Sequence, residues 1–316
     1  MRTSTPEITV AMTAYNAAAY LRGAMDSILA QSFEDFELLV VDDGSTDTTL
    51  ALAQSCDDKR VRVERLPVNK GRATARNMAL GRARGRYLAW MDADDVALPH
   101  RLQAQHACLE ARPDIHICGS AIQYFGHSSA LELFPEQPGA ARAATLFGVP
   151  VPNCCAMLRL DAVRAFGLRY DATLARAEDM AFWADALLQA GMQAVNLREP
   201  LLHYRYAPAA HVRQWHMRAL LGHVFPPLGI RATGAQAALH AGLIYEDPAE
   251  PEAALRWLDT LWQAWTARHG RDEHMQRHLL VFMTRILRKA SADPVQAEQA
   301  AGVLRTLSLA ALAENS

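Results

Sequence analysis

Short apolar runs alternate with amphipathic segments along the first half of the chain. The apolar runs are hydrophobic at consecutive positions, which is typical of strands buried on both faces of a sheet. Strands are predicted over residues 8–14, 36–41, 61–66 and 87–91. The segments between them repeat their apolar residues at helical spacing, so helices are predicted over residues 17–31, 46–54, 72–84 and 99–111. Asn16 is the predicted N-cap of the first helix.

Strands of this kind, joined by helices, form parallel βαβ units. The predicted fold is therefore α/β, with a doubly wound, mainly parallel sheet and helices on both faces in three layers. Residues 1–212 are assigned to this domain. In such sheets, ligands bind beyond the carboxyl ends of the strands.

The last hundred or so residues change to a purely helical pattern that prolines interrupt. Residues 213–316 are therefore predicted to form a C-terminal helical region. Two of its helices carry wide apolar stripes, namely Leu255, Leu258, Leu261, Trp262 and Trp265 on one, and Leu279, Leu280, Met283, Ile286 and Leu287 on the other. We expect the stripes to pack against each other; dimer contacts and docking on a membrane surface are the alternative uses.

Composition and charge narrow the function classes. The chain has 316 residues, of which 51% are hydrophobic, and a formal net charge of −2. A large core can be buried, and a generally basic nucleic-acid-binding surface is not expected. The first apolar run is too short for a signal peptide and no window reaches the length of a membrane span, so a soluble cytoplasmic protein is expected. The five cysteines lack metal-ligand spacing and are interpreted as free, buried thiols.

Two adjacent aspartates, Asp42 and Asp43, end the second predicted strand and precede the turn sequence "GSTDTT". Their charges repel and their desolvation is costly, so the pair requires an explanation. A phosphate-binding turn at this place uses glycines, backbone donors and a cation instead of carboxylates. The remaining roles are to accept hydrogen bonds from a ligand, to hold a cation, or to cap the next helix.

A second acidic group, "DADD", follows the fourth strand and contains Asp92, Asp94 and Asp95. Two carboxylates in a D-x-D turn converge on one site, and their hard oxygens suit Mg²⁺ or Mn²⁺, which would complete its coordination with phosphates. The alternative is that Asp94 and Asp95 introduce the next helix, with Pro99 at its first position. Parallel topology can bring both acidic strand ends to one crevice, which favours ligand binding over helix capping.

Three blocks of the sequence resemble, in order, the inverting family 2 glycosyltransferases with the GT-A fold. The blocks are "ITVAMTAYNAAAYLRGAMDSILAQSFEDFELLVVDDGSTDTT", "NKGRATARNMALGRARGRYLAWMDADDVALPHRL" and "RAEDMAFWADALLQAG". The similarity runs from about Ile8 to Tyr206, roughly the first two thirds of the chain. It implies that residues 1–212 form a GT-A domain that binds a nucleotide-sugar donor and carries out catalysis.

The resemblance also implies a role for each matching residue of the donor site. The residues expected to bind the nucleotide are Thr13, Tyr15, Asn16, Asp43, Arg76 and Asp92, and Asp94 is expected to bind Mg²⁺ or Mn²⁺. Asp43 would accept the N–H of the base, which makes a buried carboxylate tolerable because the ligand supplies the missing donor. Asp42 would instead hold the loop. Arg76 would face the pyrophosphate as a bidentate donor, with a solvated helix arginine as the alternative.

The third block places an acidic pair, Glu178 and Asp179, at the start of a helix that ends at Gly191. Taken alone, an acidic pair in a first helical turn is explained by the helix dipole. The resemblance makes Asp179 the catalytic base, which takes the proton of the acceptor hydroxyl, and Glu178 a residue that orients the acceptor or shares that task.

The sequence departs from the family pattern at two places. Asn153 stands where many relatives carry a His near the acceptor site, and Ala207 stands where a His after the Y-R-x pattern often assists the metal. His203 and His211 are the candidates to replace the second of these, although a single His near a strand is more often structural.

The expected activity is transfer of a sugar from a nucleoside diphosphate, with a uridine diphosphate sugar as the favoured donor, to a hydroxyl of a glycan or a lipid-linked saccharide, with inversion. Such an acceptor would bring the cytoplasmic protein to the inner face of the membrane as a peripheral protein. The alternatives are a degenerate nucleotide-sugar-binding protein and a sugar nucleotidyltransferase. The latter expects a glycine-rich phosphate loop, whereas "TAYNAAAY" contains no glycine.

Overall fold

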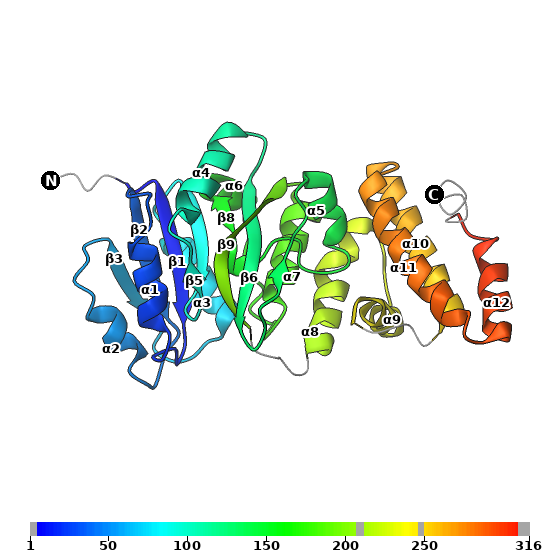
Figure 1. Ribbon diagram of the computed structural model, residues 1–316, viewed down its shortest axis with the longest axis horizontal. Helices are drawn as coiled ribbons and strands as arrows, with labels where there is room; N and C mark the ends of the chain where they lie inside the picture. The colour runs from blue at the N-terminus through cyan, green and yellow to red at the C-terminus, as the bar shows by residue number, and fades with distance from the viewer. Residues whose placement is uncertain (1–4, 207–211, 246–249, 309–316) are drawn as a thin grey trace.

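The structure is a computed structural model that describes residues 5–206, 212–245 and 250–308. The sheet and its helices form one end of an elongated molecule, and the last four helices form the other end (Figure 1). Ala207 and His211 lie outside the described residues. Within the described ranges, no helix combines the length and the apolar character that crossing a membrane requires.

The four strands predicted from the apolar runs form one half of the sheet, and their prediction is confirmed. They are β1 (Ile8–Ala14), β2 (Phe36–Asp42), β3 (Val61–Arg65) and β4 (Tyr87–Asp92). These strands are parallel and lie in the order β3-β2-β1-β4. Alternate residues of β1 and β2 face two different apolar cores, which is why apolar residues occur at consecutive positions in these strands.

Helices cover both faces of this half, in the predicted three layers. The helices α1 (Leu21–Leu29), α2 (Thr49–Gln54) and α4 (Arg101–Ala111) contribute to one core. The helices α3 (Arg72–Arg82), α6 (Leu160–Ala165) and α7 (Glu178–Ala184) contribute to the other. The helix α7 continues into a π-helical turn, η2 (Asp185–Gln189).

The other half of the sheet is mixed and has no counterpart in the predicted strands. Its strands are β5 (Val96–Ala97), β6 (Ile117–Gly126), β7 (Leu131–Glu132), β8 (Met157–Arg159) and β9 (Ala194–Tyr206). The strand β8 joins the halves, since it is antiparallel to both β4 and β6. The long strands β6 and β9 are parallel, and β5 and β7 are short antiparallel additions. The sheet is therefore mainly parallel, with the order β3-β2-β1-β4-β8-β6-β9-β5.

The predicted N-cap of one helix and the predicted first residue of another are wrong. The helix α1 begins at Leu21 after a turn, so Asn16 is not its N-cap. The helix α4 begins at Arg101 with His100 before it, so Pro99 is not its first residue, and neither Asp94 nor Asp95 caps it. In both places a loop with its own hydrogen bonds lies between the strand and the helix, a feature that hydrophobic periodicity does not report.

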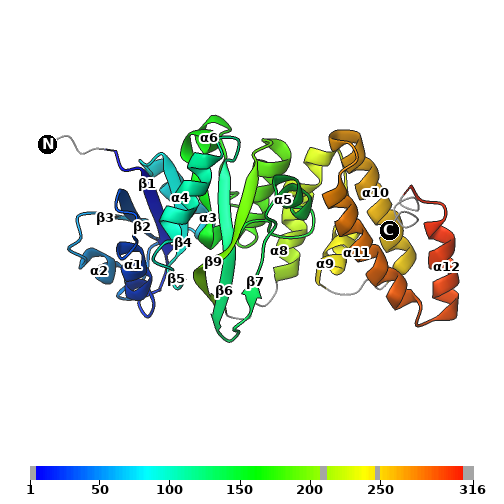
Figure 2. The ribbon, with the colours of Figure 1, turned by 45° about the horizontal axis from the view of Figure 1, so that its top comes forward.

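The C-terminal helices are α8 (Val212–Ala219), α9 (Gly234–Tyr245), α10 (Pro251–His269), α11 (Glu273–Ala290) and α12 (Pro294–Leu304), with short turns η3 (Leu220–Val224) and η4 (Pro226–Leu228). Figure 2 shows α10 and α11 side by side, as the apolar stripes predict. Their buried residues belong to one apolar cluster that also includes Phe147 and Met180 of the sheet region. The helix α5 (Pro138–Ala144) contacts α11 as well. The core therefore crosses residue 212, where the sequence predicts a boundary between domains.

All five cysteines are free thiols, namely Cys56, Cys108, Cys118, Cys154 and Cys155. The last three are buried, whereas Cys56 and Cys108 are partly exposed.

Candidate functional site

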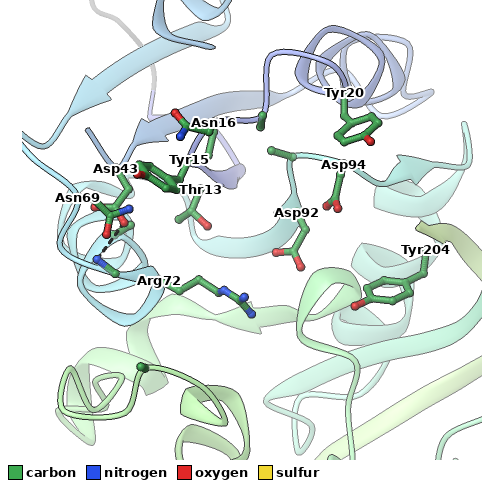
Figure 3. A pocket seen from close by; sticks show the side chains of 16 residues that line it. Thr13, Tyr15, Asn16, Tyr20, Asp43, Asn69, Arg72, Asp92, Asp94 and Tyr204 are labelled. Carbon is green, nitrogen blue, oxygen red and sulfur yellow. Dashed lines mark hydrogen bonds between the residues drawn. The ribbon is translucent and has the colours of Figure 1, made fainter. Parts of the chain in front are cut away.

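An open pocket of about 470 Å³ lies at the carboxyl ends of β1, β2 and β4. Its polar lining comprises Thr13, Tyr15, Asn16, Tyr20, Asp43, Asn69, Arg72, Asp92, Asp94 and Tyr204 (Figure 3). The strand register explains the convergence, because Thr13 pairs with Asp92 on one side and with Val41 on the other. Six of the residues singled out in the sequence therefore face one cavity, whereas Arg76, Glu178 and Asp179 are absent from its lining.

Asn16 ties the loop after β1 to the loop after β2. Its backbone N–H donates to Ser45 Oγ at 2.9 Å, and its Oδ1 accepts from the Thr46 N–H at 2.9 Å. These bonds hold Asn16 at a φ of 48°, in the left-handed region that asparagine tolerates better than most residues. The wall of the pocket around Tyr15 is therefore fixed by the loop of Asp42 and Asp43.

Asp42 holds its own loop, as the sequence predicts. It is fully buried, and its carboxylate oxygens accept from the Ser45 N–H at 3.3 Å. The guanidinium Nε of Arg65 lies 3.4 Å from Asp42 Oδ2 and supplies the opposite charge. Helix capping is excluded for this residue, because α2 has Thr48 as its N-cap.

Asp43 faces the pocket from the same turn. Its two oxygens accept from the backbone N–H groups of Lys70 and Gly71, at 2.8 and 3.0 Å. Burial raises the pKa of Asp43 and the charge of Asp42 adds to the rise, while the two amide bonds oppose it. Each carboxylate oxygen retains a lone pair for a ligand donor, so the geometry permits a hydrogen bond from a nucleotide base.

Arg76 is buried outside the pocket lining, where it joins two carboxylates. Its Nη1 donates to Glu178 Oε1 at 2.7 Å, and its Nη2 lies 3.4 Å from Asp92 Oδ1. The residue is 2% exposed, which excludes a solvated helix arginine. Burial alone would lower the pKa of Arg76, but the charges of Asp92 and Glu178 raise it. The cation that lines the pocket is instead Arg72, one turn earlier on α3.

Two of the three carboxylates in the segment "DADD" face the pocket, and the third is buried in the core. Asp92 and Asp94 point into the pocket in Figure 3. Burial raises the pKa of Asp94, and the charge of Asp92 raises it further, so a cation between them would relieve their repulsion. Asp95 is 1% exposed, accepts from the Arg205 N–H at 2.8 Å and leaves its Oδ2 without a hydrogen bond.

The donor set fits a hard divalent cation at the pocket face of the D-x-D turn. Among the described residues, carboxylate oxygens of Asp92 and Asp95 and the thiol of Cys154 also come within 4.8 Å of one another. Burial raises the pKa of Cys154 well above its ordinary value, so the thiol is a poor ligand for Mg²⁺ or Mn²⁺. The oxygens of Asp92 and Asp94, which face the ligand space, are the better pair.

The acidic pair begins α7 behind the pocket. The residue before it, Ala177, has a φ of 61°, which is rare for a residue with a side chain and costs backbone strain. Glu178 is 1% exposed and points at Arg76; burial raises its pKa against the opposing charge of that arginine. Asp179 is partly exposed, and Oδ1 accepts from the Met180 N–H at 2.8 Å. Two adjacent carboxylates thus have different environments, one paired in the core and one open to solvent.

The sequence analysis does not identify several residues that line the site. Arg72, Tyr20 and Tyr204 line the pocket, and Arg72 Nη1 lies 3.7 Å from Glu178 Oε1. The position of Arg72 at the start of α3 is the signal that could have identified it, because helix N-termini bind anions. Arg205 lies between the rings of Tyr20 and Phe125, 4.3 and 4.4 Å from their centroids, and no local pattern indicates that contact.

The structure describes one of the two positions at which the sequence departs from the family pattern, since Ala207 lies outside the described residues. Asn153 is buried, its Oδ1 accepts from the Tyr170 hydroxyl at 2.8 Å, and its Nδ2 has no hydrogen-bond partner. His203 lies within β9, paired with Val96 of β5.

The sequence of residues 9–165 matches the family described as "Glycosyl transferase family 2". The putative glycosyltransferase EpsE of Bacillus subtilis (strain 168) is 31% identical over 208 residues, which cover 64% of this chain and 74% of that protein. The "UDP-Glc:alpha-D-GlcNAc-diphosphoundecaprenol beta-1,3-glucosyltransferase WfgD" of Escherichia coli is 36% identical over 98 residues, 31% of this chain and 39% of that protein.

Two solved structures share the fold. The crystal structure of S. aureus TarS 1-349 in complex with UDP-GlcNAc has a TM-score of 0.62 and 18% identity, and the match covers 82% of this chain and 81% of that one. The mannosyltransferase PcManGT from Pyrobaculum calidifontis, in complex with GDP-Man and Mn²⁺, has a TM-score of 0.54 and 20% identity over 98% of this chain and 87% of that one.

The mixed, mainly parallel sheet with its pocket at the strand ends has the GT-A fold. The sequence matches show that the chain is a glycosyltransferase. The chain belongs to glycosyl transferase family 2.

Proposed function

We propose that this glycosyltransferase transfers a sugar with inversion from a uridine diphosphate sugar to a hydroxyl of a glycan or lipid-linked saccharide. The observation that carries the proposal is that Asp43, Arg72 and Asp94 face one pocket from three different elements. An acceptor for a base N–H, a cation for a diphosphate and a metal-binding carboxylate are what a nucleotide sugar requires.

Two observations support a uridine donor, namely the position of Asp43 and the donors named for two similar proteins. Uracil carries an N–H that a carboxylate oxygen can accept, and the pocket offers Asp43 at its nucleoside end beside Tyr15 and Asn16. The names of WfgD and of the TarS complex include UDP-Glc and UDP-GlcNAc. PcManGT was solved with GDP-Man, and guanine also carries an N–H, so a guanosine diphosphate sugar is the alternative donor that the test includes.

Asp92 and Asp94 would hold Mg²⁺ or Mn²⁺, as the presence of Mn²⁺ with PcManGT suggests. Such a cation would neutralise the charge of the departing diphosphate. Arg72 binds the same diphosphate from the N-terminus of α3. Arg76 keeps Asp92 and Glu178 in place through its two guanidinium nitrogens.

Asp179 is the proposed catalytic base. It takes the proton of the acceptor hydroxyl while the acceptor oxygen forms a bond to the anomeric carbon, and the nucleoside diphosphate leaves with the electron pair of the broken bond. Glu178 is unsuited to that role, because Arg76 occupies its carboxylate in the core. The proposed role of Glu178 is to hold the first turn of α7 in place through Arg76.

The acceptor assignment follows the lipid-linked acceptor in the name of WfgD. Such an acceptor would place the protein at the cytoplasmic face of a membrane, as a peripheral protein. Neither a homodimer nor the surface that would meet the membrane follows from the described residues, so both stay predictions.

The test is release of diphosphate from a panel of nucleotide sugars with Mn²⁺, followed by transfer once an acceptor is found. Asp179→Asn should reduce turnover by the 10²–10⁴-fold typical of a lost general base, with donor affinity unchanged. Transfer at the native rate by Asp179→Asn would move the base elsewhere. If the native chain binds a nucleotide sugar but neither hydrolyses nor transfers it, the degenerate binding protein is the correct alternative.

A further inference from the structure

The imidazole of His223 bridges two carboxylates at the junction between the C-terminal helices and the catalytic half. His223 lies in η3, and its Nδ1 is 3.0 Å from both oxygens of Asp185, in the π-helical turn that continues α7. Its Nε2 is 3.2 Å from Asp171 Oδ2. The side chains are 19%, 24% and 29% exposed for His223, Asp185 and Asp171, so the bridge is largely screened from water.

Asp171 is the first residue of the loop 171–177, which leads directly into the acidic pair. Asp171 Oδ1 accepts from the N–H and the hydroxyl of Thr173, at 2.8 Å each, so its side chain shapes the start of the loop. Within the loop, Ala175 lines the nucleotide pocket and Ala177 takes the strained left-handed conformation before Glu178. Most of the remaining loop residues are exposed, and Leu174 is its one other buried anchor before Ala177.

Only the protonated ring satisfies both ends of this bridge. A carboxylate only accepts hydrogen bonds, and a neutral imidazole donates from one nitrogen and presents a lone pair at the other. Loss of the proton would therefore leave one carboxylate facing a lone pair. The two ring nitrogens point in opposite directions, so the three side chains do not converge on a single point as metal ligands would.

We propose that protonated His223 is a positioning residue of the transferase: it clamps the loop 171–177 to the helix that carries Asp179, and it releases the loop when it loses its proton. The role deepens the proposed function, since it matters for transfer only if Asp179 acts as the base. The C-terminal helical region thereby contributes to catalysis without touching the substrate.

The charges around the bridge support protonation. The hydrogen bond to Asp185, followed by that to Asp171, raises the pKa of His223 above its ordinary value against the opposing effect of burial. Other titratable or charged groups on the elements packed against η3 have different partners. His216 bonds Tyr245, His240 bonds the Leu146 carbonyl and Glu178 bonds Arg76. Asp179 accepts from the Met180 N–H, Arg213 donates to the Ala238 carbonyl and Arg218 lies over the Trp215 ring. Because the folded pKa is raised, the clamp is complete below an ordinary histidine pKa and is lost as the pH rises through the folded value.

The test uses trypsin cleavage after Arg176, an exposed arginine within the loop, followed by mass spectrometry on the full chain. Rates are compared from about pH 6 to about pH 9, a range that brackets an imidazole pKa. His223→Gln should be cleaved roughly tenfold faster than the native chain at the low end of the range, as expected for a lost charged hydrogen bond. The matched control is His100→Gln, which removes an exposed histidine paired with Glu199 and should behave as the native chain at every pH.

Asp171→Asn gives the sharper test. The amide keeps an oxygen for Thr173 and offers an N–H to the neutral Nε2, so the bridge is satisfied without the proton. The native chain and the His100→Gln control should both become more susceptible as the pH rises, whereas Asp171→Asn should stay protected. A native pH dependence retained in Asp171→Asn, or native protection in His223→Gln, would overturn the proposal.

The same variants separate the clamp from the proposed function. In His223→Gln transfer should fall roughly tenfold. The donor affinity should change less, because Ala175 is the single residue of the loop in the pocket lining and the polar lining lies on other elements. If cleavage follows the prediction but transfer does not change, the loop is clamped and Asp179 is not the base. If His223→Gln does not fold, the Asp171→Asn profile and the NMR titration of His223 in the native chain still decide the matter, since an unshifted neutral ring at neutral pH contradicts the clamp.

Discussion

Arg76 Nη1 lies 2.7 Å from Glu178 Oε1, in an ion pair whose side chains are 3% and 1% exposed and whose residues are 102 positions apart. The pair fastens the first turn of α7 to the face of α3 beneath the nucleotide pocket. Removing one partner of a buried pair is costly, because the other charge stays in the core without compensation. The acidic pair at the start of α7 is thus held by an interaction that no short stretch of sequence contains.

Arg76→Ala should lower the free energy of unfolding by about 3–5 kcal/mol, since Glu178 then remains buried without its partner. The control is Arg82→Ala on the exposed face of the same helix, where a change within about 0.5 kcal/mol is expected. Urea unfolding of both variants measures the difference. Adding Glu178→Gln to Arg76→Ala should recover part of the loss, and a loss that is simply additive would contradict the coupling.

Asp43→Ala should weaken binding of uridine diphosphate by about 1–3 kcal/mol, because the base N–H loses its acceptor. The structure adds a second effect, since the Lys70 and Gly71 amides also lose their acceptor at the pocket wall. Asp43→Asn keeps one acceptor oxygen and should therefore lose less affinity. Calorimetric titration measures both; Asp57→Asn, at an exposed position, is the control. Native affinity in Asp43→Ala would remove the residue from the donor site.

The features that the sequence predicts correctly are those that a local pattern determines. The strands β1, β2 and β4 are apolar at most positions and are separated by helical segments, so their existence and their parallel pairing follow from the local pattern. The strand β3 alternates apolar and charged residues, which is also a strand pattern. The presence of Asp43 and Asp94 in the pocket lining follows from their places after these strands.

What the sequence does not predict depends on contacts between distant segments. The strand β9 carries exposed polar residues in its middle and pairs with both β6 and β5, so no alternation marks it. Arg72 and Arg76 are equivalent in the helical pattern, and only the place of Glu178 decides which of them is buried. The bridge of His223 joins residues 38 and 52 positions away in the chain, which leaves no local signal.

A chain that ends at Tyr245 should be less soluble and should melt at a lower temperature than the full chain. It loses α10, α11 and α12, whose apolar residues share one cluster with Phe147 and Leu146, and these would become exposed. The control ends at Ser308 and keeps all three helices. Calorimetry and size-exclusion chromatography measure the change. A truncated monomer with the melting temperature of the full chain would show that α10, α11 and α12 are an independent module.

His240 lies at this junction in an unambiguous neutral form. Its Nε2–H donates to the Leu146 carbonyl at 2.6 Å, and its Nδ1 accepts from the Trp257 Nε1–H at 2.9 Å. A carbonyl only accepts and an indole only donates, so both ring nitrogens are satisfied without a charge. Phe147 stacks on the ring, with centroids 5.5 Å apart. Burial lowers the pKa of His240 from an ordinary 6.5 to about 4.

This lowered pKa predicts an acid-sensitive attachment of the C-terminal helices. Because the unfolded chain takes up the proton first, the contribution of His240 is complete above about pH 6.5 and is lost as the pH falls toward about pH 4. The loss can reach about 3 kcal/mol, since one pKa unit corresponds to about 1.4 kcal/mol. His240→Gln can replace both hydrogen bonds and has no proton to gain, so its stability should fall less over this range than that of the native chain. His100→Gln, at an exposed position, should retain the native pH dependence. Thermal unfolding across the range measures all three, and parallel losses in the native chain and His240→Gln would assign the acid sensitivity to other groups.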